Sequence, residues 1–229
     1  MSASPRAKLA KRWTAAQIRE IELLLRQSPI DYGAIEQRVG RTPAVEGERI
    51  DLRAFPFSRA IDTVSISGLD LSYTRWNSVG GLTRVVATDS TLRSIRFEAT
   101  PFSERFAQCD LARSTFSECQ GMPDAVFEGC TFNEAKFVGC DFLRCLFRRC
   151  AFDRAKFAGA EFYECVFENC SLNDATFEDA SFGRSRFIGL RTNVVYTHLE
   201  DMSERRYIQN PHGPIVALGE TNMIGVIFE

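Results

Sequence analysis

Histidine and tryptophan are scarce in this chain of 229 residues, with two of each. The histidines, His198 and His212, lie near the C-terminus. No Walker loop, nucleophile elbow, HExxH motif or dinucleotide fingerprint occurs. A general base, a phosphate-binding loop and a histidine-based metal site therefore lack sequence support. We expect a protein that is not an enzyme, with no catalytic residue, no metal and no cofactor.

Long apolar runs are also absent. No segment approaches the roughly eighteen consecutive apolar residues that a membrane-spanning helix needs. The basic start, MSASPRAKLAKRW, has no apolar stretch behind it of the kind that a secretory signal requires. We therefore expect no membrane contact and a cytoplasmic location.

Cysteine is present in eight copies, but no C-x-x-C pair occurs among them, which argues against a zinc site. The cysteines share their sequence slot with alanines such as Ala135 and Ala155. Free cysteine behaves as a small apolar residue that is often fully buried. We expect these thiols to be reduced core residues, with Cys130, Cys150 and Cys170 on one side of the fold and Cys145 with Cys165 on another.

A phenylalanine or leucine recurs at every fifth position, as in FEGCTFNEAKFVGCDFLRCLFRRCAFDRAKF. An odd step of five would send alternate rings to opposite faces of a strand, and it would carry them around a helix. A chain that turns a corner every five residues would instead keep all of them inside. The predicted inward-facing residues are Phe127, Phe132, Phe137, Phe142, Phe147, Phe152, Phe157, Phe162, Phe167, Leu172, Phe177, Phe182 and Phe187.

The units CTFNE, AKFVG, CDFLR and ATFED each place a small residue and a polar residue before the central Leu or Phe. This pattern resembles that of pentapeptide-repeat proteins, clearly over 125–189 and less regularly over about 64–120. The resemblance implies a mainly β fold, a right-handed four-sided parallel β-helix with about twenty residues per coil. The central and small residues would point inside. The family includes topoisomerase-protecting proteins and secreted effectors, so the resemblance specifies the fold more closely than the function.

A coil of twenty residues makes a prediction about charge, because residues twenty apart would be neighbours across a ladder. Glu128, Arg148 and Glu168 alternate in sign at this step. Between residues 125 and 189 the step of twenty gives six opposite-sign pairs and two like-sign pairs, whereas steps of fifteen and ten give no comparable excess. The like-sign pairs are Lys136 with Lys156 and Asp141 with Glu161.

Four regions follow from the spacing: an N-terminal helical cap over 1–49, an irregular β-helix over 50–124, a regular β-helix over 125–190 and a C-terminal cap over 191–229. Thr14 and Gln17 form a plausible capping box for a helix through about Gln27. Asp31 can cap a second short helix, YGAIEQRV, which Gly40 would end.

Breaks in the spacing predict bulges or projecting loops. They occur at Gly81–Leu82, between Phe102 and Phe106, and over 119–125, where one extra residue intervenes. Over 191–229 we expect a short helix and a hairpin that cover the end of the solenoid. Alternatively, that hairpin pairs with another copy, so the protein is either a monomer or a homodimer through its C-terminal segment.

A concentration of acidic residues is the candidate partner-binding site. Residues 157–183 hold six acids and no base, next to a basic coil over 144–156. A solvated surface with cross-coil ion pairs would also explain this contrast. The residues of this acidic coil are Glu161, Glu164, Glu168, Asp174, Glu178 and Asp179.

The expected function is that of a non-enzymatic scaffold, a solenoid that presents rigid faces and projecting loops to a protein partner. The alternative is a DNA mimic that protects or inhibits DNA gyrase or topoisomerase IV, a type II topoisomerase, as the resemblance implies. Against it, the net charge of −2 is nearly neutral, whereas DNA carries one negative charge per about 1.7 Å. Nucleic-acid binding by the basic N-terminal segment (Lys8, Lys11, Arg12 and Arg19) is a third possibility, which we do not expect.

Overall fold

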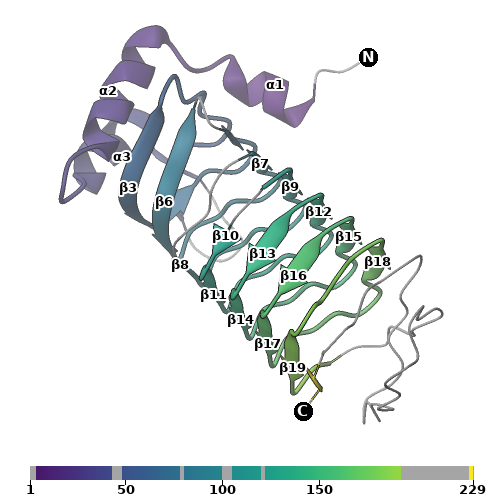
Figure 1. The fold of residues 1–229 in the computed structure, drawn as a ribbon. Coiled ribbons are helices and arrows are strands. Elements are labelled where there is room, and N and C mark those ends of the chain that lie inside the picture. The colour runs from purple at the N-terminus through teal and green to yellow at the C-terminus, as the bar shows by residue number, and fades with distance from the viewer. Residues whose placement is uncertain are drawn as a thin grey trace.

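The structure, a computed structural model, describes residues 4–42, 48–77, 80–99, 105–119, 122–191 and 227–228. Short parallel strands stack coil upon coil, and helices lie at one end of the stack (Figure 1). The predicted mainly β solenoid is confirmed.

The N-terminal helices are α1 (Pro5–Ala10), α2 (Ala15–Leu25) and α3 (Tyr32–Val39). The predicted capping box is confirmed, because the Thr14 side chain accepts from the Gln17 amide and the Gln17 side chain accepts from the Thr14 amide. The Asp31 side chain caps α3, and Gly40, with φ 71°, ends it. Helix α2 stops two residues before the predicted Gln27, and α1 was not predicted.

Each coil has four sides. The eight-stranded side consists of β20 (Ile227–Phe228), β19 (Arg186–Ile188), β17 (Val166–Glu168), β14 (Leu146–Arg148), β11 (Val126–Glu128), β8 (Arg105–Ala107), β6 (Gly81–Thr88) and β3 (Ala60–Ser67). The six-stranded side consists of β18 (Thr176–Glu178), β15 (Lys156–Ala158), β12 (Lys136–Val138), β9 (Thr115–Ser117), β7 (Arg96–Glu98) and β5 (Arg75–Trp76).

The other two sides are less continuous. The three-stranded side consists of β10 (Met122–Pro123), β13 (Asp141–Leu143) and β16 (Glu161–Tyr163), which lie between the eight-stranded and six-stranded sides in Figure 1. The fourth, or bridge, side carries a line of single β-bridges from Asp70 to Arg191. At the start of the solenoid, β1 (Arg41–Thr42), β2 (Arg49–Asp51) and β4 (Leu69–Asp70) form a small sheet, in which β1 and β2 are antiparallel.

The register confirms a coil of twenty residues in the regular part. Val126 lies opposite Leu146, and Leu146 lies opposite Val166. One coil earlier the step is twenty-one, because Arg105 lies opposite Val126. This confirms the extra residue that the spacing placed within 119–125.

The interior is filled by the predicted inward-facing residues. All thirteen are between 0 and 2 % exposed. Their rings form stacked columns: Phe147 lies 5.0 Å from Phe127 and 4.8 Å from Phe167, with nearly parallel planes. Each coil of the regular part therefore contributes one side chain to each column, a phenylalanine ring except at Leu172, and burial of these side chains is the main stabilising term.

One predicted loop is wrong. Gly81 and Leu82 begin β6 and pair with Ala60 and Ile61 of β3, so they do not project. A Cβ at residue 81 would come within 2.7 Å of Trp76, and its φ is +127°. The change of spacing there reflects a glycine that lets the chain pass close to Trp76 at the start of an eight-residue strand.

Several predictions fall outside the described residues. They are the loop over 100–104, the two residues at 120–121, and all of the C-terminal segment except Arg191 and Ile227–Phe228. In the described part of that segment, β20 pairs in parallel with β19.

Candidate interaction surface

The corners, where the chain passes from one side of a coil to the next, carry side chains that project from the solenoid. The residue two positions after each central Phe or Leu lies in the left-handed region, as at Arg144 (φ 53°) and Glu164 (φ 55°). In the described chain twenty non-glycine residues have positive φ, most of them at such corners. The two residues that flank each central position also face outward. The outer surface is thus a set of parallel rows, one residue per coil.

Two corner rows carry alternating charge. Along one, the Arg144 Nε lies 2.8 Å from an Asp124 carboxylate oxygen, and Arg184 lies 3.6 Å from Glu164. The hydrogen bond from Arg144 lowers the pKa of Asp124. Along the other, Glu134 bonds Arg113 at 3.1 Å. These ladders bear out the prediction that charges alternate from coil to coil.

The acidic coil divides into paired and unpaired carboxylates. Glu168 accepts a hydrogen bond from Arg148 at 2.8 Å, and Glu164 pairs with Arg184. In contrast, Glu161, Glu178 and Asp179 are exposed and form no ion pair with any residue that the structure describes. Asp174 lies at a corner, with φ 56°. The six predicted site residues therefore do not act as one uniformly negative surface.

Glu128 is paired differently from the prediction. Arg148 is its register neighbour, as expected, but Arg148 hydrogen-bonds Glu168 instead. The carboxylate of Glu128 binds Arg105 and Arg149. The corner position of Arg149 lets its side chain reach back to the preceding coil, which spacing alone does not reveal.

The two like-sign pairs are neighbours in space as well. Lys136 lies directly opposite Lys156, and Asp141 lies opposite Glu161. None of these four residues forms an ion pair within the described part of the chain. Exposed apolar side chains lie on the same coils: Val138 is 44 % exposed and Tyr163 is 42 % exposed. Like charges opposite each other destabilise a sheet, so this part of the surface has a cost in stability.

A buried ion cluster joins the N-terminal helices to the first coil, and the sequence analysis missed it. Arg12 donates to both Asp51 carboxylate oxygens at 2.6 Å, and Arg53 donates to the same carboxylate at 2.9 and 3.0 Å. Burial acts to raise the pKa of Asp51, but these hydrogen bonds outweigh it and hold that pKa well below its usual value. The cluster is structural and offers no open site.

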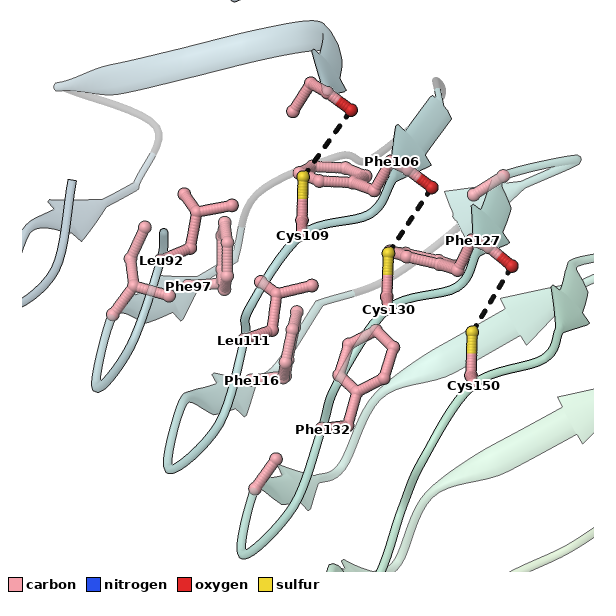
Figure 2. Packing of buried hydrophobic residues seen from close by; sticks show 14 of the residues in the cluster. Leu92, Phe97, Phe106, Cys109, Leu111, Phe116, Phe127, Cys130, Phe132 and Cys150 are labelled. Carbon is pink, nitrogen blue, oxygen red and sulfur yellow. Dashed lines mark hydrogen bonds between the residues drawn. The ribbon is translucent and has the colours of Figure 1, made fainter. Parts of the chain in front are cut away.

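The cysteines line the interior as expected, and all eight are free and buried. Each thiol in one column donates to a backbone carbonyl of the previous coil, as Cys130 does to Phe106 and Cys150 to Phe127 (Figure 2). Burial is the first cause that raises the pKa of Cys150. A thiol that stays protonated, as that of Cys150 does, is a poor nucleophile and a poor metal ligand.

No group of three or more His, Cys, Asp or Glu side chains among the described residues is arranged to hold a metal ion. No helix in the same part of the chain is long and apolar enough to span a bilayer. His198 and His212 lie outside it.

Comparison with known proteins agrees with the repeat architecture. Residues 122–149 and 150–189 match the family model for pentapeptide repeats, in eight copies. No curated protein shows significant sequence similarity to the chain.

The matches among solved structures have low sequence identity. A trypsin-treated form of QnrB1, a plasmid-mediated fluoroquinolone resistance protein, aligns over 76% of this chain and 84% of its own, with 12% identity and a TM-score of 0.41. HetL, a pentapeptide repeat protein involved in heterocyst differentiation regulation from Nostoc sp. strain PCC 7120, aligns over 74% and 85%, with 13% identity and a TM-score of 0.25. None of these similarities identifies a partner or an activity of this chain.

Proposed function

Because residues 122–189 are pentapeptide repeats, we propose that the chain works as a non-enzymatic protein-binding solenoid. The observation that carries this proposal is the division between inside and outside. Aromatic columns and small side chains fill the interior. Other molecules can therefore contact only the rows of exposed side chains on this rigid frame. Solenoid repeats bind partners in this way.

The binding surface that we propose is the unpaired part of the acidic coil. Glu161, Glu178 and Asp179 lie close together in the chain's fold, on the three-stranded and six-stranded sides and the corner between them. Their charge is available to a basic partner, whereas Glu164 and Glu168 already bind arginines. The proposed partner is therefore a protein with a basic surface, and the eight free thiols fit a reducing, cytoplasmic setting.

The test compares two neutralised variants in affinity capture from a host lysate. The first is Glu161→Gln with Glu178→Gln and Asp179→Asn. The matched control is Glu164→Gln with Glu168→Gln, which removes carboxylates of the same coil that are already paired. We expect the first variant to lose a partner that wild type and control both retain. Equal recovery by all three proteins would refute the acidic surface.

A second candidate function is protection of a type II topoisomerase. The unpaired acids favour it, because a basic DNA-binding groove would attract them. Arg144, Arg148 and Arg154 on the neighbouring coil interrupt the negative surface, so this mimicry of DNA would be confined to one edge. Purified protein should then inhibit supercoiling by DNA gyrase or relieve quinolone-stabilised cleavage. No effect at several-fold excess over the enzyme would remove this candidate.

A further inference from the structure

The six-stranded side separates its charges lengthwise into two rows. The first position of each strand holds a base or a threonine and never an acid. The register places these residues in one line: Arg75, Arg96, Thr115, Lys136, Lys156 and Thr176. We call this line the basic row.

The opposite half of the same side is acidic. The third strand positions and the corner that follows them hold Glu98, Glu118, Glu178 and Asp179, and no base. We call these four residues the acidic row. On the coils of β12 and β15 the line of the acidic row holds no charge and is low and apolar, with Val138, Ala158 and the glycines at 139 and 159, so that Glu118 lies one coil before Lys136 and Glu178 lies one coil after Lys156. A Cβ at either glycine would contact nothing within 4 Å.

This separation is unlike the rest of the solenoid. On the eight-stranded side the third positions alternate, as Glu128, Arg148 and Glu168 do. On the six-stranded side Arg75 pairs with Glu98. The other charged residues of the two rows form no ion pair with each other or with any other described residue.

We propose that the six-stranded side binds the same side of a second copy of this chain, with the two solenoids parallel. A half-turn about an axis along the solenoid exchanges the two rows, so each basic row would face the partner copy's acidic row. A half-turn about an axis parallel to the strands would make the two solenoids antiparallel and place each row against its own copy, base on base and acid on acid. The charge pattern is thus self-complementary in the parallel arrangement alone.

The same charge pattern indicates which molecule binds the six-stranded side. A nucleic acid presents negative charge only, and Glu118, Glu178 and Asp179 would repel it. A second copy meets both rows and brings an apolar strip to the exposed Val138. The bare corners at residues 139 and 159 let the partner's lysine side chains lie close to the backbone. This inference concerns self-association and does not rest on the proposed binding of another protein.

The experiment uses the purified full chain alone, in sedimentation equilibrium across protein concentration and at low and high salt. Wild type should associate reversibly to twice its monomer mass of 25.8 kDa. High salt should weaken the association by about tenfold or more, because exposed charges are screened. A protein that stays monomeric throughout overturns the proposal.

Charge exchange then identifies the surface. Lys136→Glu with Lys156→Glu should abolish self-association, and so should Glu178→Lys with Asp179→Lys. An equimolar mixture of these two variants should associate, because an acidic face then meets a basic one. If either variant associates as wild type does, or if the mixture remains monomeric, the contact lies elsewhere and the proposal fails.

The matched control is Arg6→Glu with Lys8→Glu on α1, which changes the net charge by the same amount at exposed positions outside the strands of this side. It should associate as wild type does. Should a reversal variant fail to fold, Lys136→Gln with Lys156→Gln serves in its place. This variant should weaken association by about tenfold while retaining the wild-type circular dichroism spectrum. Unchanged affinity in this variant would also overturn the proposal.

Discussion

At the scale of single residues, the corners set what the surface can carry. A left-handed conformation costs a non-glycine residue roughly 1–2 kcal/mol, yet Arg, Glu, Asp and Asn occupy corners repeatedly. The amide of a corner residue offsets part of that cost by bonding a carbonyl one coil on, as the Arg154 amide does with Asn173 at 2.7 Å. Long charged side chains can therefore stand at every turn of the chain.

Removal of one ring from the middle of a column should be costly. Phe157 stacks 4.9 Å from both Phe137 and Phe177 and is 1 % exposed. Phe157→Ala leaves a cavity between two fixed neighbours, so we expect the free energy of unfolding in urea to fall by about 3–5 kcal/mol.

Phe157→Leu is the control, since Leu172 fills the equivalent slot elsewhere and is also buried. It should lose less than half as much stability. A loss below about 1 kcal/mol for the alanine variant would contradict the stacked interior.

The buried cluster at the first coil predicts a pH dependence. The pKa of Asp51 is lowered by Arg12 and Arg53, so its ionised form favours the folded state. That contribution is complete above the unfolded-state pKa of about 4 and is lost as the pH falls below it. Asp70 acts in the opposite direction, because burial raises its pKa. The unfolding free energy should decline with acid below about pH 4, less steeply for Asp51→Asn than for wild type.

Asp51→Ala should also cost about 1–3 kcal/mol at neutral pH, because it leaves two partly buried arginines, Arg12 and Arg53, without their carboxylate. Asp179→Asn, which removes an exposed carboxylate, is the comparison and should keep the wild-type stability at neutral pH. If Asp51→Asn and wild type have the same slope, Asp51 is not held in this cluster.

At the scale of elements, local signals and repeat spacing predicted different parts of the molecule. The caps at Thr14 and Asp31 and the step of twenty follow from short-range rules, and the structure has them. Helix α1 was missed because it buries no residue, so it leaves no apolar period in the sequence. The irregular coils were harder, since β3 and β6 are eight residues long and follow no five-residue rule.

The ion contacts show a similar limit. Spacing identified which residues are neighbours, but the Glu128 carboxylate binds Arg149, which reaches it from a corner, and Arg105, which reaches it diagonally from the start of β8. The ion pair between Arg12 and Asp51, which are thirty-nine residues apart in the sequence, depends on how the helices pack on the first coil. The sequence alone does not show which carboxylates of the candidate surface lack an ion-pair partner. That becomes clear only once the structure shows which residues share a row.

The capping box gives a prediction for α2. Thr14→Ala removes the acceptor for the Gln17 amide and should lower the unfolding free energy by about 1 kcal/mol. Thr14→Ser keeps the hydroxyl and should be close to wild type. Urea denaturation of both variants checks this, and equal stability of the alanine and serine variants would show that the cap contributes nothing.

At the scale of the whole molecule, a solenoid is held together by contacts between neighbouring coils, so its stability is distributed along one axis. The two ends are not equivalent. At the start, α2 and α3 bury Ile21, Leu25 and Ile35 against the first coils. The later coils have no such helical cover in the described part of the chain. A destabilising substitution in a middle coil should therefore affect the two halves of the solenoid differently. The coils that the helices cover should stay folded more than the later coils do.

Amide hydrogen exchange on Phe157→Ala tests this asymmetry. In wild type, amides of the paired strands on both sides of residue 157 should exchange slowly, because opening one coil breaks its contacts with two others. In the variant, amides of β16, β17 and β19 should lose far more protection than those of β3, β6 and β8, which stay attached to the helices. Phe187→Ala, near the far end, should raise exchange only around β19. A uniform loss of protection across all strands in Phe157→Ala would mean that the molecule opens as one unit, and that the N-terminal helices do not anchor one end of it.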